Sequence, residues 1–364
     1  SAFVLLFSFR HGLDRTLFNI FNIHQQHHYI WLQFKRDETQ QPRHRQAPNV
    51  GCNMEKIIIN YPNFDTKGKY FFSGDKIIWE SVDKLFELLE TESKSPNTPF
   101  IYRGLSEAKY FIFNSSQREY IKQKKYLKLN ETEYFSNYEQ FILDNISKLK
   151  LWQNGLVEKF FQANGILEDN TIAYLSFMQH YNIPTPLIDF TRNPFVALYF
   201  AISDHNGSVK NNSDKPLDDF ISIYRIYKPT IIHELFHGFF RFYNLDLNSI
   251  PYKKLSNSIG LYLLSNEDGK LKLNNNANII NQEGVFYYNH HPFCPLEVKY
   301  NLIVNELKNE SNLSDKITSK IPIKIGYCMN IYKKLIPEIR EKLNKMGINK
   351  DYLFPDFTKI HQHL

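Results

Sequence analysis

The feature that most constrains this chain is a polar segment between two apolar runs, FMQHYNIPTPLIDFTRNPFVALYFA, from Phe177 to Ala201. The first run is predicted to end a helix over residues 171–181. Asn193 followed by Pro194 is typical of a helix N-cap and first turn, which predicts a second helix over 195–203. Polar side chains at helix ends can serve only as caps, because helix termini leave backbone groups without partners. The segment therefore predicts either a buried, hydrogen-bonded corner or one wall of a pocket.

Short apolar runs and capped amphipathic segments alternate along the rest of the chain. This alternation predicts an α+β fold, a single mixed domain with one or more small sheets flanked by helices. The expected strands are 56–60, 70–73, 100–102, 220–227, 284–288 and 321–328. The further helices expected are one capped by Ser81, one from Asn130 to Leu151 with a capping box at Glu133, and one over 330–346.

Residues 1–53 differ from the remainder in composition. They hold five of the thirteen histidines and no sustained period, and their six Lys/Arg against three Asp/Glu supply +3 of the net charge of +6. We expect a poorly structured leader without function here. Met54 is expected to begin a single α+β domain over residues 54–364, which ends in a strand and a helix.

Composition argues against several classes of protein. No apolar run is long enough for a transmembrane helix, so we expect no membrane association. Cys52, Cys294 and Cys328 are too widely spaced for a disulfide framework or a zinc cluster, which favours the cytoplasm. The mild positive charge is not the concentrated basic face of a nucleic-acid-binding protein.

The segment QHYNIPTPLIDFTRNPFVALYFA resembles the core motif of the FRG-domain family of bacterial proteins. That motif runs roughly Gln-His-x-Gly-x-Pro-Thr-x-Leu-x-Asp-aromatic-Thr, followed by Pro and Ala-Leu-x-Phe-Ala. The aromatic-Arg-Gly step of the family resembles Tyr102-Arg103-Gly104 here, and the resemblance covers about residues 97–290. By family association, it implies a role in bacterial stress or phage defence.

Two shorter elements extend the resemblance. Residues 281–286, NQEGVF, look like the family's Gln-x-Gly-x-Phe element, and GINKDYLFPDF resembles a tail found in these proteins. Asn182 stands where the family has glycine, and Pro186 stands at an Arg-like position. Loss of that positive charge puts an anion contact at Pro186 in doubt.

The residues of these blocks predict a pocket for an anionic ligand, such as a nucleotide. We expect the strand at 100–102 to end at Arg103 and Gly104, which would place a guanidinium at its edge and let a ligand approach the backbone. The predicted ligand contacts are Tyr102, Gly104, Ser116, Arg118, Gln179, Thr185, Thr191 and Gln282, and the predicted catalytic side chains are Arg103, His180, Asp189 and Glu283. The alternative for Arg103 is a buried salt bridge to Asp189 that joins two blocks.

IYRG also resembles the first-strand arginine element of ADP-ribosyltransferases, which implies an ADP-ribosyltransferase-like fold. In those enzymes the arginine engages the phosphate and ribose of NAD, and a Ser-Thr-Ser strand and a late glutamate follow. Here FNSSQRE follows Arg103 too closely to match that strand, and Glu283 is the later carboxylate, with Glu297 nearby. The resemblance implies NAD as substrate of a transferase or glycohydrolase.

Two other functional hypotheses remain open. The motif HELFH would place His233 and His237 on one helix face with Glu234 as general base on a zinc-bound water, but the sequence offers no third ligand at the expected place. The pocket could equally belong to a non-catalytic sensing or interaction module with a protein partner of unknown kind. The basic stretch QREYIKQKKYLKL is better read as a solvated helix face than as a track for phosphates.

Overall fold

The computed structural model describes residues 59–72, 81–95, 98–124, 129–208, 216–228, 262–264, 277–310 and 324–356. The predicted leader, residues 1–53, lies outside these ranges. Within them, helices alternate with the strands of one mixed sheet, so the α+β prediction is confirmed. No helix in the described ranges is long and apolar enough to span a membrane.

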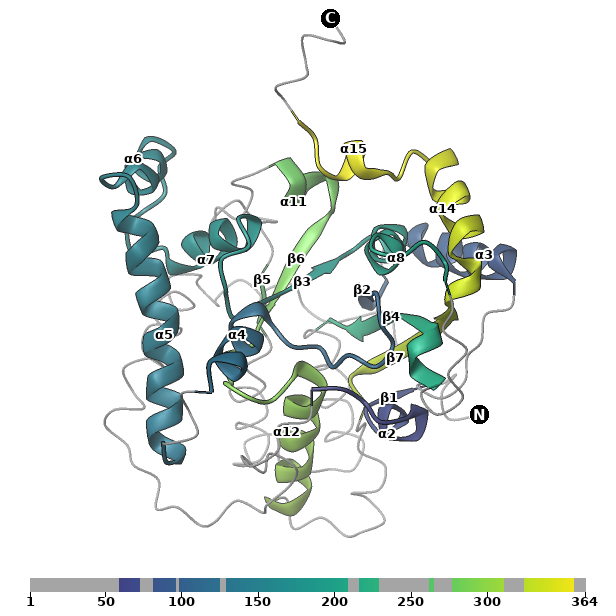
Figure 1. Cartoon of the computed structure of the whole chain (residues 1–364), viewed down its shortest axis with the longest axis horizontal. Helices are drawn as coiled ribbons and strands as arrows, with labels where there is room; N and C mark the ends of the chain where they lie inside the picture. Colours follow the sequence, from purple (N-terminus) through teal and green to yellow (C-terminus); the bar gives the residue numbers. More distant parts are fainter. Residues whose placement is uncertain are drawn as a thin grey trace, which may run out of the picture. The chain divides into compact units, whose positions relative to one another are not determined.

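Seven strands of the described ranges form the sheet (Figure 1). They are β1 (Phe71–Phe72), β2 (Phe100–Leu105), β3 (Leu187–Thr191), β4 (Phe220–Tyr227), β5 (Tyr262–Leu264), β6 (Gly284–Tyr288) and β7 (Gly326–Tyr332). Their order is β1-β7-β4-β2-β3-β6-β5; β1 runs parallel to β7, and the other pairs are antiparallel. β4 and β6 have the predicted bounds.

The described helices cover both faces of this sheet. They are α2 (Phe64–Gly68), α3 (Val82–Ser93), α4 (Ser115–Gln123), α5 (Glu131–Leu151), α6 (Leu156–Ala163), α7 (Thr171–His180), α8 (Pro194–Ile202), α11 (Ala277–Asn281), α12 (Leu296–Glu310), α14 (Ile336–Lys345) and α15 (Lys350–Leu353), with 3-10 turns η4 (Pro216–Asp219) and η5 (Lys333–Leu335). The caps predicted at Ser81, Asn130 and Asn193 are all present. Each side chain accepts a hydrogen bond from a backbone N–H of the first helical turn, as expected for an N-cap.

Three boundary predictions were wrong. β2 does not end at Arg103 but continues to Leu105, because its whole length pairs with β4. The final helix begins at Ile336 rather than residue 330, because β7 runs through 326–332 in register with β4. The expected strand over 321–328 is therefore shifted toward the C-terminus.

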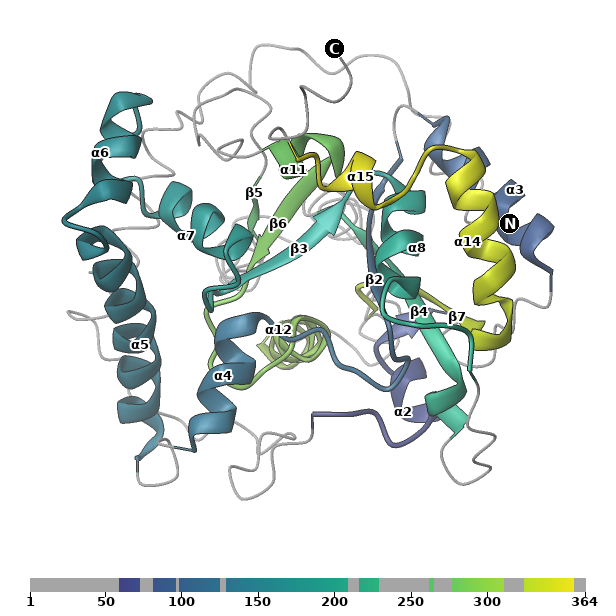
Figure 2. The same ribbon diagram turned by 45° about the horizontal axis from the view of Figure 1, so that its top comes forward.

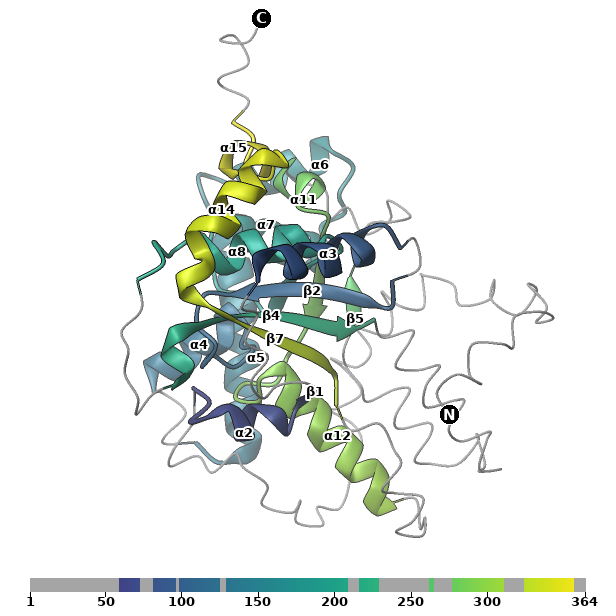
Figure 3. The ribbon, with the colours of Figure 1, turned by 90° about the vertical axis from the view of Figure 1, so that its right-hand side faces the viewer.

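The sheet packs on two apolar layers. Figure 3 shows α3, α8 and α14 on one side of β2, β4 and β7, and α2 and α12 on the other. On the first side these helices bury Leu85, Leu198 and Ile339 against Ile223 of β4. The half of the sheet that contains β3 and β6 packs on α5, α6 and α7 through residues such as Phe161 and Phe286.

The sheet is nearly divided between β2 and β3. These strands share the single residue pair Tyr102–Thr191, whereas β2 pairs with β4 over six residues and β3 pairs with β6 over five. β2 and β3 therefore separate beyond this pair, and the backbone groups of β3 facing the separation need other partners.

β3 itself is the largest departure from the predicted fold. The sequence predicts a corner in which two helices meet, but the chain between α7 and α8 forms a central strand. Five residues that follow a Pro-Thr-Pro turn and include Asp189 and Thr191 carry a weak strand signal. Tertiary pairing with β6 decides the conformation.

Candidate functional site

Asp189 is exposed in the middle of a buried strand. The other four residues of β3 are buried, whereas the Asp189 side chain is 54% exposed. Figure 2 shows β3 between α7 and α8. Solvent therefore reaches the face of a central strand at this carboxylate, which is the arrangement expected of a site rather than of a closed corner.

Arg103 reaches from β2 to the backbone of Asp189. Its Nη1 donates to the Asp189 carbonyl oxygen at 2.5 Å and lies 3.9 Å from the Asp189 carboxylate oxygen Oδ2. The guanidinium thus takes the place of a missing ladder bond where β2 and β3 separate. The predicted proximity of the two residues is found, although the main contact is to the carbonyl.

The Arg103 side chain is only 15% exposed, and among the described residues its Nε has no hydrogen-bond partner. Burial lowers the pKa of Arg103, the Asp189 carboxylate raises it, and the positive charge of Arg118 lowers it again. The guanidinium remains charged at neutral pH because an arginine pKa lies far above 7. Arg103 therefore keeps a buried donor free beside a second cation.

Arg118 supplies that second positive charge from the exposed side of α4. Its Nη1 donates to the Phe113 carbonyl at 2.7 Å, which fixes one end of the guanidinium. The packing around it lowers the pKa of Arg118, and the Asp189 carboxylate raises it. Two guanidinium groups therefore act on one carboxylate, and these three side chains sum to +1.

Gln179 and Thr185 hold the Asp189 carboxylate in place. Gln179 Nε2 donates to Asp189 Oδ2 at 2.6 Å, and the Thr185 hydroxyl donates to Gln179 Oε1. Thr185 is in turn bonded through its backbone to Ser115 Oγ and to the Ser116 N–H of α4. We call Arg103, Arg118, Gln179, Thr185 and Asp189 the Asp189 site.

Two predicted ligand contacts on β2 have packing roles instead. Tyr102 is fully buried in the apolar layer under α8, and its hydroxyl lies 3.3 Å from Thr98 Oγ1. A Cβ at Gly104 would lie 1.9 Å from the Ala197 carbonyl oxygen of α8, so the glycine lets the helix approach the strand. Tyr102 is therefore closed to a ligand, whereas the close approach of α8 gives Gly104 a role in packing. Ser116 is likewise fully buried.

Gln282 and Glu283, from the predicted NQEGVF element, bond groups outside the Asp189 site. Gln282 donates from Nε2 to the Leu353 carbonyl of α15 at 3.0 Å, and its own carbonyl accepts from Thr191 Oγ1 at 2.6 Å. Glu283 accepts from Asn193 Nδ2 at 2.9 Å, at the start of α8. The side-chain amide of Gln282 therefore connects this segment to the C-terminal helix α15.

His180 also points elsewhere. Its Nδ1 lies 3.3 Å from Asn278 Nδ2 of α11, although Gln179, the preceding residue, contacts Asp189. Consecutive helical residues diverge by about 100° around the axis, so both cannot face one site. Burial lowers the pKa of His180, which keeps the imidazole neutral near pH 7.

Comparison with family models assigns the central part of the chain. Residues 98–210 match the model of the FRG domain. The chain contains an FRG domain. Searches of curated proteins and of solved structures gave no match.

The whole Asp189 site lies within the FRG domain. The matched residues include β2, α4, α7, β3 and α8, which supply Arg103, Arg118, Gln179 and Asp189. Gln282, Glu283 and the tail at α15 lie beyond the matched residues and form a separate contact. All five residues of the Asp189 site therefore come from the matched part of the chain.

The α4 cap was missed at the sequence level. Asn114 and Gln117 form a capping box, a pattern that the spacing in NSSQ carries and that would have placed Ser115, Ser116 and Arg118 on one helix. The first turn of the helix is also bonded to the segment before β3, because the Ser116 N–H donates to the Thr185 backbone carbonyl at 3.1 Å.

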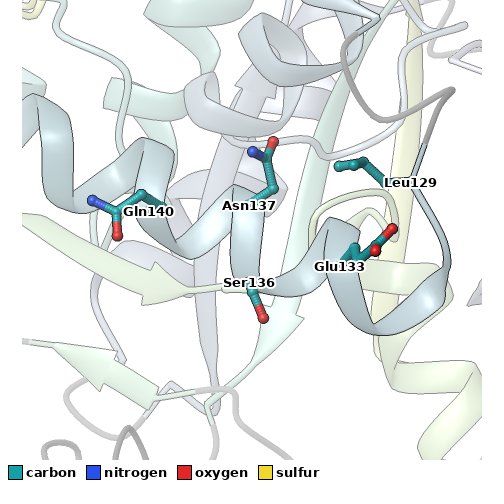
Figure 4. A pocket seen from close by; sticks show the side chains of 5 residues that line it. All are labelled: Leu129, Glu133, Ser136, Asn137 and Gln140. Carbon is teal, nitrogen blue, oxygen red and sulfur yellow. The ribbon is translucent and has the colours of Figure 1, made fainter.

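The rival sites receive no support from the described residues. The motif at His233, Glu234 and His237 lies outside them, and within them no three metal-ligating side chains cluster. Figure 4 shows an open depression lined by five side chains from a single stretch of chain, namely Leu129, Glu133, Ser136, Asn137 and Gln140. It brings together no distant parts of the sequence, unlike the Asp189 site.

Proposed function

We propose that the Asp189 site binds an anionic nucleotide-type ligand and that NAD is its substrate. The observation that carries this proposal is the charge arrangement: Arg103 Nη1 lies 3.9 Å from the solvent-open Asp189 carboxylate, and Arg118 interacts electrostatically with the same carboxylate. Arginine binds phosphate oxygens through a planar fork of donors, and Arg103 and Arg118 both carry this group. Asp189 and Gln179 would accept from ribose hydroxyl groups.

An ADP-ribosyltransferase-like arrangement accommodates these roles. Arg103 lies on a central strand beside the separation of the sheet, and the resemblance of IYRG to the transferase arginine strand implies that it engages phosphate and ribose. Asp189 is the carboxylate that shares a site with Arg103, whereas Glu283 is bonded to Asn193. Asp189 is thus the better candidate to stabilise positive charge on the ribose.

The reaction would break the bond between the ribose anomeric carbon and nicotinamide. The bonding electron pair leaves with the nicotinamide nitrogen, and the Asp189 carboxylate stabilises the oxocarbenium-like carbon electrostatically. Water, or a nucleophile of an acceptor, then forms a bond to that carbon and releases a proton. The products are nicotinamide and ADP-ribose, free or attached to the acceptor, in the stress or phage-defence setting that the family association implies.

A non-catalytic sensing module is the second candidate. The internal hydrogen bonds of the Asp189 site favour it, since Arg103 donates to a backbone carbonyl and Gln179 bonds both Asp189 and Thr185. A site that is held together without a ligand could recognise one without changing it.

The test follows nicotinamide release and ADP-ribose mass on protein after NAD is added to the full chain, with and without cell lysate. We expect release that is lost in Asp189→Asn and in folded Arg103→Ala but kept in Glu283→Gln. Binding of ADP-ribose by calorimetry, without release in any condition, would leave the sensing module. Neither release nor binding by a folded wild type would overturn the nucleotide proposal.

A further inference from the structure

The C-terminal helix α15 is four residues long and is docked on the rest of the domain. Its Leu353 side chain is fully buried in the apolar layer that includes residues of α8. Asn281 Nδ2, at the end of α11, donates to the Tyr352 carbonyl at 2.6 Å. Gln282 Nε2 donates to the Leu353 carbonyl at 3.0 Å, and Figure 2 shows α15 beside α11. A helix this short is not stable alone in water, so its structure depends on docking.

Gln282 connects α15 to the end of β3. Its backbone carbonyl accepts from Thr191 Oγ1 at 2.6 Å, while its side chain bonds Leu353. The next carbonyl, that of Glu283, accepts from the Arg192 N–H at 3.1 Å. The segment 281–283 therefore bonds α15 on one side and the C-terminal end of β3 on the other.

The backbone of the segment 281–283 has an uncommon conformation. Glu283 has a φ of 47°, in the left-handed region that favours glycine. The helix that precedes it, α11, has five residues and depends on tertiary contacts for its stability. The hydrogen bond from Gln282 to α15 is one such contact. Its loss favours relaxation of Glu283 to an ordinary conformation, which would withdraw the carbonyl groups of the segment from β3.

Thr191 lies at the point where β3 joins β2. It forms the single residue pair between these strands, with Tyr102, and its side chain is buried. Asp189 is two residues earlier on the same strand, so both side chains extend from the same face. A shift of the strand end at Thr191 therefore moves the Asp189 carboxylate relative to Arg103 of β2.

We propose that docking of α15 regulates the Asp189 site, because it positions the Asp189 carboxylate through Gln282 and Thr191. With α15 docked, the end of β3 is held and the carboxylate keeps its place beside Arg103. With α15 detached, the carboxylate shifts and affinity for the ligand falls. The effect on affinity rests on the nucleotide binding proposed above, whereas the coupling between α15 and β3 depends on the hydrogen bonds alone.

The test measures amide hydrogen exchange of α15, β3 and β4 in the full chain without ligand. Leu353→Asp is the variant that releases α15, because burial of a carboxylate in an apolar layer is costly. Gln282→Met removes the amide donor, keeps a side chain of similar length and serves if Leu353→Asp does not fold. Tyr352→Ala removes an exposed side chain and keeps the backbone carbonyl, so it is the matched control.

We expect both release variants to accelerate exchange in β3 about fivefold or more, with β4 and the control unchanged. Exchange in β3 that stays at the wild-type rate in both variants would overturn the coupling. Equal acceleration of β3 and β4 would overturn it as well, since it would mean general destabilisation.

Calorimetry with ADP-ribose connects this coupling to the ligand. Affinity should fall about fivefold or more in Leu353→Asp and Gln282→Met, and ADP-ribose should slow exchange of α15 in the wild type, because coupling is reciprocal. Accelerated exchange of β3 with unchanged affinity would overturn the regulatory role. A wild type that shows the coupling by exchange but does not bind ADP-ribose would instead overturn the nucleotide proposal.

Discussion

The Asp189 site and the polar network around Lys67 both bury charge against the sheet, yet they differ in how far their groups are satisfied. Lys67 is fully buried, and its Nζ donates to Ala108 O at 2.8 Å, Ser222 Oγ at 2.7 Å and Asn330 Oδ1 at 2.8 Å. Three protons thus meet three acceptors. In the Asp189 site, Arg103 Nε has no hydrogen-bond partner within the part of the chain that the structure describes, and the Asp189 carboxylate is open to solvent.

This difference distinguishes a structural network from a candidate ligand site. A fully satisfied buried network has nothing left to offer a ligand and fixes the packing around it. The Lys67 network connects α2, the loop after β2, β4 and β7 in this way. A cluster with an excess of positive charge and an exposed member instead suits the anion-binding role that we propose for the Asp189 site.

The largest expected effect concerns Gly104, the neighbour of Arg103 on β2. Gly104→Ala would place a Cβ against the Ala197 carbonyl and the Ala201 nitrogen of α8, which are backbone atoms that cannot move alone. We expect a loss of unfolding free energy of about 4 kcal/mol or more, or no folded protein. Urea denaturation measures it, with Gly284→Ala, where the nearest atom is 3.4 Å away, as the milder control.

Lys67→Ala should be next in severity. It would remove a buried ammonium group that donates to three buried acceptors, so we expect about 3–5 kcal/mol of destabilisation by the same measurement. Lys69→Ala, at an exposed position, should lie within about 0.5 kcal/mol of the wild type. Equal stability of the two variants would mean that the Lys67 network is not scaffold.

Arg118→Gln should lower ligand affinity while leaving stability nearly unchanged. Arg118 is exposed and bonds one backbone carbonyl, so its loss should leave the Tm nearly unchanged. Affinity for ADP-ribose should fall about tenfold or more, since a charge-assisted phosphate contact contributes roughly 1.5–3 kcal/mol. Lys122→Gln, on the same helix, is the matched control for calorimetry. A large fall in Tm with unchanged affinity would place Arg118 with the scaffold.

Glu297→Gln is expected to give the smallest change in unfolding free energy, and this change depends on pH. Its carboxylate accepts from the Tyr61 hydroxyl and from the Ile112 N–H at 3.1 Å, and burial raises its pKa above the usual value. A raised folded-state pKa contributes stability below the unfolded value of about 4.3, and this stability is lost as pH rises through the folded pKa. The wild type should therefore lose stability relative to Glu297→Gln over that interval.

Unfolding free energies of the two proteins between pH 4 and pH 8 measure this difference. Glu338→Gln, at an exposed position of α14, is the matched control. A difference between wild type and Glu297→Gln that stays constant with pH would show that Glu297 keeps the same proton in the folded and unfolded chain.

Local signals in the sequence predicted much of the secondary structure. The caps at Ser81, Asn130 and Asn193 and the strands β4 and β6 depend on neighbouring residues or on an uninterrupted apolar run. β3 was missed because five residues after a proline turn have no sustained period, and pairing with β6 determines them.

All five residues of the Asp189 site were among the site residues predicted from the sequence. Four of them form a connected set of hydrogen bonds. Arg103 donates to the Asp189 backbone carbonyl, Gln179 donates to the Asp189 carboxylate, and Thr185 donates to Gln179. His180 was expected with them, but helix geometry turns it toward Asn278. Gln282 was also expected, but its amide bonds the tail at Leu353, a contact between residues 71 positions apart.

The sequence by itself therefore determined the α+β class, the FRG domain and which blocks carry polar chemistry, because these depend on composition and on short motifs. Only the tertiary structure decided which of those polar groups are satisfied and which are open. The separation of β2 from β3, the approach of α8 to Gly104 and the exposure of Asp189 each depend on contacts between distant segments. A hydrogen bond depends on position and direction, and these are fixed only when the whole chain has packed.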